Sequence, residues 1–276
     1  MNFTIRRKRN RRLYILIRVA LVAGLITAVK LGVHQLGWEF ISINPLFSAL
    51  VASTVFLLSF LLNGVLSDFK ESEKLPGEIA SCLRLIAQAT NAVTIDNPKA
   101  NVHEPLLAIG DLSQGVLQWI KADSSTVTLL RIFDHTHDKL VPVYLLLGDS
   151  PLKARLSTEL AALIRSIHRI DVIRETDFVE MVYWLANFAT VTLCCGLIFS
   201  KGYPQQELAL LLFIISFLLV FVLHLISDID NPFGFSDFSS AEDVDLEVLE
   251  YTNQHIQELI TSYTLVHNRA PIKAGA

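Results

Sequence analysis

Four long apolar segments dominate the pattern of hydrophobic and polar positions along the chain. They are Leu13–Val33, Pro45–Leu66, Phe178–Phe199 and Leu208–Ile226. A helix needs about 20 apolar residues to cross the core of a bilayer, and each segment meets that length. Short polar connections, residues 34–44 and 200–207, join the segments in two pairs. The pattern predicts an all-α, polytopic membrane protein with four transmembrane helices in two hairpins.

Residues 67–177, between the two hairpins, show apolar positions at helical rather than strand spacing. Helices are expected around Ile79–Ala87, around Leu106–Ile120 with Gly110 and Gly115 loosening it, over Ser124–Asp138, and from Pro151 onward. The apolar pattern of the C-terminal tail predicts one more helix over Asp243–Leu265. No helix breaker separates Leu66 from Glu73, so the second span is expected to continue as a helix. The helix through Arg165 is likewise expected to run into the third span. The expected domains are 1–12, 13–66, 67–177, 178–226 and 227–276.

Charge is distributed unevenly and gives an orientation. Residues 1–12 hold six Lys or Arg and no acid, whereas in residues 227–276 the acidic residues outnumber the basic ones. Basic residues before a first span favour the cytoplasmic side of the membrane, so both termini and residues 67–177 are expected in the cytoplasm. The expected membrane is an inner or plasma membrane. A cleaved signal peptide is less favoured, because the first apolar segment is too long and lacks a clear cleavage site.

The composition, 52% hydrophobic and 18% charged, excludes a disordered chain and a nucleic-acid-binding arm. No phosphate loop, nucleophile elbow or metalloprotease motif is present, so we expect no enzyme, no cofactor and no metal. His135 and His137 do not face each other on a helix. His224 and Asp228, near the end of the fourth span, are either ion-pathway residues or solvated interface residues.

The second span is uncharged and rich in small and hydroxyl residues, which are Ser48, Ala49, Ala52, Ser53, Thr54 and Ser59. Such residues allow close helix packing, and they can also line a pore in a ring of identical helices. The pattern alone leaves both interpretations open.

Two short motifs make the chain resemble the bestrophin family. The first follows the second span and comprises Phe60, Asn63, Phe69, Glu71, Lys74, Leu75 and Gly77. The second follows the fourth span as Asp230, Asn231, Pro232, Phe233 and Gly234. Leu61, Leu66 and Pro76 stand where the family has Arg, Tyr and Trp. Phe235, Ser236, Asp237 and Phe238 stand in place of the acidic run that binds calcium in eukaryotic members, which argues against a calcium site of that kind.

The resemblance implies a homopentamer in the lipid bilayer that passes small inorganic ions through a pore lined by the second span. One register places Ala49, Ser53 and Leu57 toward that pore, and a shift of one residue places Phe56 and Phe60 there instead. Eukaryotic relatives favour anions, as chloride channels do, whereas an acidic tail at the pore mouth would favour cations. The alternatives are a non-conducting scaffold that acts through residues 67–177 and, with less support, a secondary transporter.

Overall fold

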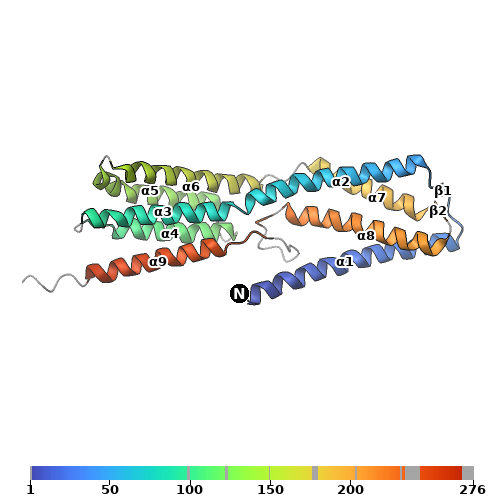
Figure 1. Ribbon diagram of the computed structural model, residues 1–276, viewed down its shortest axis with the longest axis horizontal. Helices are drawn as coiled ribbons and strands as arrows, with labels where there is room; N and C mark the ends of the chain where they lie inside the picture. Colours follow the sequence, from blue (N-terminus) through green and yellow to red (C-terminus); the bar gives the residue numbers. More distant parts are fainter. Residues whose placement is uncertain are drawn as a thin grey trace, which may run out of the picture. The chain divides into compact units, whose positions relative to one another are not determined.

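The computed structural model describes residues 2–97, 100–121, 124–148, 150–175, 180–202, 204–230, 232–233 and 243–268. Within these ranges it describes side chains from residue 13 onward, except at residues 96, 180, 205 and 266–268. Its contacts divide the chain into two compact units (Figure 1). The first comprises Met1–Lys70 and Thr176–Asp243, and the second comprises Glu71–Glu175 and Val244–Ala276. We call them the membrane unit and the helical unit.

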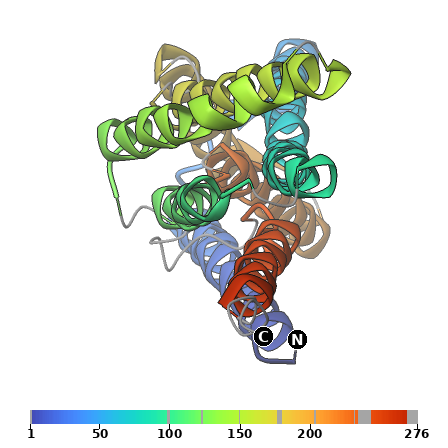
Figure 2. The same ribbon diagram turned by 90° about the vertical axis from the view of Figure 1, so that its left-hand side faces the viewer.

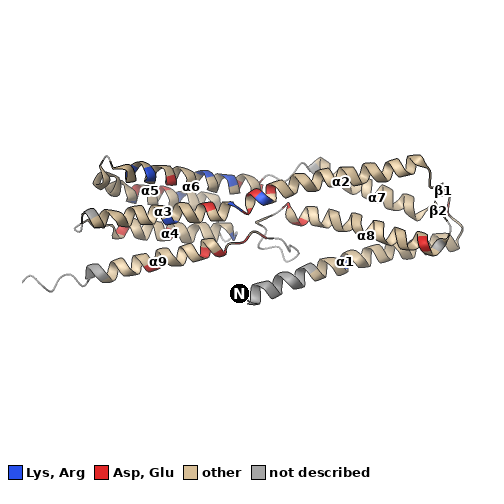
Figure 3. Ribbon diagram, in the orientation of Figure 1, with Lys and Arg blue, Asp and Glu red and all other residues tan. Residues whose placement is uncertain are grey.

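The membrane unit is built from four long apolar helices, which are α1 (Asn2–Gln35), α2 (Pro45–Ser72), α7 (Glu180–Ile198) and α8 (Gln205–Ile229). All four predicted spans are confirmed as helices long and apolar enough to cross a membrane. Over the part that Figure 3 colours, from residue 13 onward, charged residues are sparse along these four helices and more frequent in the other helices. α1 packs on α7 and α8, and α7 packs on α8. The expected continuation of the second span is also confirmed, because α2 runs six residues past Leu66 to Ser72.

Two very short strands connect the ends of the two hairpins, and the sequence pattern did not predict them. β1 (Ile41–Ser42) pairs in parallel with β2 (Ser200–Lys201). The ring of Phe40 stacks on that of Phe199 beside this pairing, with centroids 5.1 Å apart. A strand of two residues is too short to produce any periodicity in the sequence. The pairing holds the α1–α2 connection against the connection between α7 and α8.

The helical unit contains α3 (Leu75–Asp96), α4 (His103–Ile120), α5 (Thr126–Leu147), α6 (Pro151–Glu175) and α9 (Glu247–Asn268). α3, α4 and α9 pack on one another, and Figure 2 shows the three nearly along their axes. α5 packs on α4, and α6 packs on α3. Their apolar faces meet in a core that buries Leu83, Ile109 and Trp119 completely.

Local sequence signals explain where several of these helices begin. The hydroxyl of Ser125 accepts a hydrogen bond from the backbone N–H of Thr128, which caps α5. Pro151 is the first residue of α6, as predicted. α9 begins at Glu247 rather than at Asp243, because the side chain of Asp245 accepts from the backbone N–H of Glu247 and forms a turn before the helix. α6 ends at Glu175, and the residues that connect it to α7 lie outside the described part.

The glycines of α4 have a different role from the loosening that the sequence suggested. α4 is continuous through Gly110 and Gly115. A Cβ atom at Gly110 would lie 2.8 Å from Cδ1 of Ile260, and one at Gly115 would lie 3.0 Å from Cδ1 of Ile132. Both distances are shorter than ordinary carbon contacts. The two glycines therefore allow α9 and α5 to approach α4 closely.

Candidate functional site

One face of α2 is uncovered in the chain. Five of its exposed residues follow one line along the helix, Ala49, Ser53, Phe56, Phe60 and Asn63, and we call them the α2 stripe. Their alternating spacing of four and three residues places them on a single side of a helix. The side chains of Phe56 and Phe60 are 73% and 66% exposed. This stripe therefore brings together small, hydroxyl, aromatic and amide side chains on a surface that the chain itself does not bury.

The opposite face of α2 is packed against the rest of the membrane unit. Leu58, Leu61 and Val65 are buried in an apolar cluster with residues of α7 and α8. Leu57 packs against the same cluster and is partly buried. The geometry therefore separates Leu57 from the stripe, whereas Ala49 and Ser53 share one face with Phe56 and Phe60.

Two hydroxyl groups of α2 donate to backbone carbonyls of the same helix. Oγ of Ser59 donates to the carbonyl of Val55 at 2.8 Å, and Oγ1 of Thr54 donates to that of Leu50 at 2.9 Å. A hydroxyl bonded in this way costs little to place against an apolar neighbour and can still accept from water. These side chains are therefore compatible with either a wet or a dry environment.

Glu71 and Arg169 form a two-pronged ion pair in the helical unit. Nε and Nη2 of Arg169 each lie 2.8 Å from a carboxylate oxygen of Glu71. The hydrogen bonds from Arg169 hold the pKa of Glu71 below its ordinary value, and the charge of Lys74 adds to this effect. Both partners remain nearly half exposed. The sequence placed Glu71 near Lys74, but it could not identify Arg169 because the two residues are 98 positions apart.

The exit of the fourth span agrees with its predicted form. α8 ends at Ile229, and the backbone N–H of Asp230 donates to the carbonyl of Ile226 at 3.0 Å. Pro232 follows in a turn and is buried, as is Phe233. Proline cannot continue a helix, which explains where α8 stops. Asn231 and Gly234 lie outside the described residues.

His224 and Asp228, the ion-pathway candidates, line a cavity of about 690 Å³ inside the membrane unit. They lie four residues apart on α8, and Nδ1 of His224 is 3.0 Å from the carbonyl of Val220. α1 contributes Arg18 to the same cavity, and α7 contributes Asn187. The structure thus brings the two candidates together with a basic residue that sequence reasoning had not connected with them.

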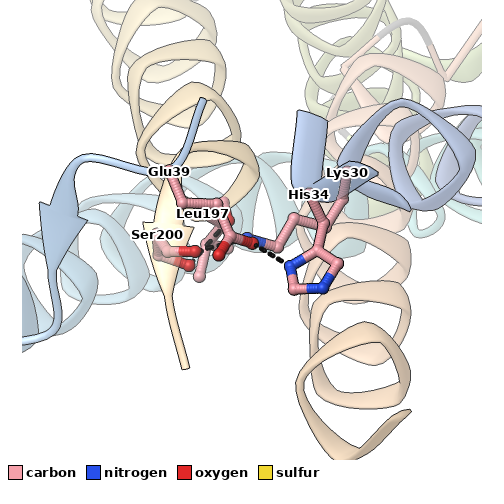
Figure 4. A network of polar contacts seen from close by, with 5 residues as sticks. All are labelled: Lys30, His34, Glu39, Leu197 and Ser200. Atoms are coloured by element: carbon pink, nitrogen blue, oxygen red, sulfur yellow. Dashed lines mark hydrogen bonds and ion pairs between the residues drawn. The ribbon is translucent and has the colours of Figure 1, made fainter. Parts of the chain in front are cut away.

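A buried charge network joins α1 to the two short strands (Figure 4). Lys30 is 1% exposed, and its Nζ lies 2.7 Å from Oε1 of Glu39. Lys30 also donates to the carbonyl of Ser200. Nδ1 of His34 lies 3.0 Å from the same carboxylate oxygen. The hydrogen bond from Lys30 lowers the pKa of Glu39, although burial opposes this effect.

Sequence reasoning did not identify this network, but a signal for it exists. Lys30 is a single lysine within an apolar span, and Glu39 is the one acidic residue of the following connection. A charge at membrane depth requires a partner, because its desolvation is costly. The nearest opposite charge along the chain was therefore the residue to consider.

No group of three or more His, Cys, Asp or Glu side chains is positioned to hold a metal ion in the part of the chain that the structure describes. His135 and His137 lie on α5, and the ring centroid of His137 is 6.3 Å from that of Tyr144, with the two rings tilted to each other. The described residues therefore offer no candidate metal centre.

Comparison with known proteins identifies the fold. No protein-family model and no curated protein matches the chain. Among solved structures, a bacterial bestrophin homologue from Klebsiella pneumoniae superposes with a TM-score of 0.71 at 15% identity, over 90% of this chain and 98% of that chain. The chain has the bestrophin fold. A single-substitution variant of the same homologue gives a TM-score of 0.74 at 14% identity, over 90% of this chain and 98% of that chain. The resemblance predicted from two short motifs is thus confirmed for the fold.

Proposed function

We propose that the chain is a homo-oligomeric ion channel, a pentamer, that passes small inorganic ions along an axis lined by the α2 stripe. The observation that carries the proposal is the two-sided character of α2. One face is buried against α7 and α8, and the opposite face is uncovered although it carries Ser53 and Asn63. A surface that faces lipid is expected to be apolar, whereas a pore uses small and hydroxyl side chains to admit water and ions.

The two aromatic side chains of the stripe supply the gate in this proposal. Phe56 and Phe60 lie one helical turn apart and are both largely exposed. In a ring of identical helices they form two apolar rings, which stop conduction by excluding water. Ala49 and Ser53 provide a wider and wetter section of the same axis. Leu57 contributes to packing, because it lies against the core of its own unit.

The six basic residues between Arg6 and Arg12, ahead of the first apolar segment, favour an orientation with both termini and the helical unit on the cytoplasmic side of an inner or plasma membrane. We expect no enzymatic activity, since conduction needs a lined pathway rather than a reacting group. The fold shared with a bestrophin homologue supports this class of function.

The first experiment is a subunit count by native mass spectrometry of the full chain in detergent and in nanodiscs. The proposal predicts a pentamer in both environments. A monomer or a dimer would contradict it, because a single α2 stripe cannot enclose an axis. A pentamer without ion flux would instead favour a non-conducting scaffold that acts through the helical unit.

A further inference from the structure

The cavity between α1, α7 and α8 is polar at one end and apolar along the rest of its length. Arg18, Asn187 and Asp228 line the end that lies nearest the N-terminus of α1. Ile26 and Ile198 line the deeper part. On α1, Ile26 lies eight positions after Arg18, which corresponds to about 12 Å along the helix axis. The volume of about 690 Å³ falls within the range of small-molecule sites.

Thr190 and Arg18 are polar groups at the cavity that have no hydrogen-bond or ion-pair partner among the described side chains. Thr190 is 3% exposed and lines the cavity, and its Oγ1 makes no hydrogen bond with any described residue. By contrast, Oγ of the buried Ser216 donates to a carbonyl one turn earlier in α8. A buried hydroxyl without a partner is costly, which makes Thr190 a group that a bound molecule could satisfy. Arg18 is exposed at the cavity mouth and forms no ion pair with the described residues.

We propose that this cavity binds one anionic phospholipid, with an acyl chain against the apolar wall and the phosphate at Arg18. The guanidinium group matches phosphate geometry and binds it with two hydrogen bonds. Tyr14, also at the cavity mouth, is typical of the level of the lipid headgroups. The six basic residues between Arg6 and Arg12, ahead of the first apolar segment, raise the local concentration of anionic lipid.

The neighbouring surface supports a lipid as the occupant. Leu21 and Leu25 of α1 are 69% and 66% exposed and present an apolar exterior beside the cavity. On the α8 side of the cavity, the carboxylate of Asp228 is negative and repels a phosphate. The phosphate is therefore expected on the α1 side, at Arg18. Arg18 thus suits the phosphate of one amphipathic lipid, and the apolar wall suits its acyl chain. The unpaired Thr190 hydroxyl can form a hydrogen bond with a polar group of the same molecule.

The test measures lipid retained by the full chain. Wild-type protein and three variants are reconstituted in nanodiscs of phosphatidylcholine with phosphatidylglycerol, and retained lipid per chain is counted by native mass spectrometry. Arg18→Gln removes the phosphate ligand, and Cys195→Trp fills the cavity from α7. Lys201→Gln is the matched control, because Lys201 is an exposed cation in β2 and outside the cavity.

We expect wild type and Lys201→Gln to retain one phosphatidylglycerol per chain in preference to phosphatidylcholine. Arg18→Gln should weaken that retention about tenfold to a hundredfold, as expected for the loss of a charged hydrogen-bond donor. Cys195→Trp should abolish the retention of both lipids. Unchanged retention in Arg18→Gln, or full retention in Cys195→Trp, would overturn the proposal. A lipid-free wild-type oligomer would also overturn it and would indicate a second copy as the occupant. Displacement of the bound lipid by inorganic phosphate alone would overturn it too and would indicate a soluble anion. The readout is lipid retention, so the result does not depend on whether the protein conducts ions.

Discussion

Nζ of Lys30 lies 2.7 Å from Oε1 of Glu39, and the lysine side chain is almost completely buried. The pair connects α1 to the polypeptide that leads into β1, and a further hydrogen bond connects Lys30 to Ser200 of β2. A buried charge is tolerated only where a partner and additional hydrogen bonds compensate its loss of water. The network therefore ties the ends of the two transmembrane hairpins to each other.

Substitutions in this pair should be strongly non-additive. Glu39→Gln leaves Lys30 buried without an anion and is expected to destabilise the membrane unit by roughly 3 kcal/mol. Adding Lys30→Met to Glu39→Gln should recover most of that loss, because no buried charge then remains. Thermal unfolding midpoints of the two single variants and the double variant in detergent measure this. A double variant less stable than Glu39→Gln would show that the pair is not the source of the effect.

The ion pair between Glu71 and Arg169 predicts a pH-dependent contribution to the helical unit. Because Arg169 lowers the pKa of Glu71 in the folded chain below its ordinary value of 4.5, the pair stabilises the fold above that pH. The stabilisation is lost as pH falls through the lowered pKa. Both side chains are nearly half exposed, so solvent screening limits the contribution to about 1 kcal/mol.

Unfolding midpoints of wild type and Glu71→Gln between pH 7 and pH 3 measure this contribution. The difference between them should be largest at pH 7 and should vanish at the acidic end. Glu73→Gln is the matched control, since Glu73 is an exposed carboxylate two residues away. A difference that grows with acidification would contradict the assigned role of the pair.

Cys82 should be an unreactive thiol in the folded chain. Burial raises its pKa to about 11, and the negative charge of Glu159 acts in the same direction. The thiolate is the reactive form, and two pKa units above 9.0 reduce its population about a hundredfold. Alkylation at pH 8, followed by peptide mass spectrometry, should therefore label Cys82 only after unfolding by denaturant. Equal labelling rates in the folded and unfolded chain would show that α3 does not shield this thiol.

The sequence predicted those features that depend on local periodicity. The four spans and the start of α6 at Pro151 follow from hydropathy and from proline chemistry, and the structure has them at nearly the predicted positions. The contacts between Glu71 and Arg169 and between β1 and β2 join residues far apart in the chain, and no local pattern encodes them. The role of Gly110 was misjudged because its neighbour Ile260 belongs to a distant helix.

The α2 stripe shows the same limit within a single helix. Helical spacing alone could place either Leu57 or Phe60 toward a pore. Only the packing of Leu57 against α7 and α8 distinguishes the two, and that information comes from other helices. Thr190 likewise became a candidate only when its missing hydrogen bond was known.

The most direct test of the channel proposal is ion conduction by purified wild type, Phe60→Ala and Leu57→Ala in planar bilayers. We predict discrete single-channel currents from wild type, a several-fold higher conductance or open probability in Phe60→Ala, and little change in Leu57→Ala. Phe60 lies on the uncovered face of α2, whereas Leu57 packs inside its own unit. No current from any of the three proteins, or a large effect confined to Leu57→Ala, would contradict a pore lined by the α2 stripe.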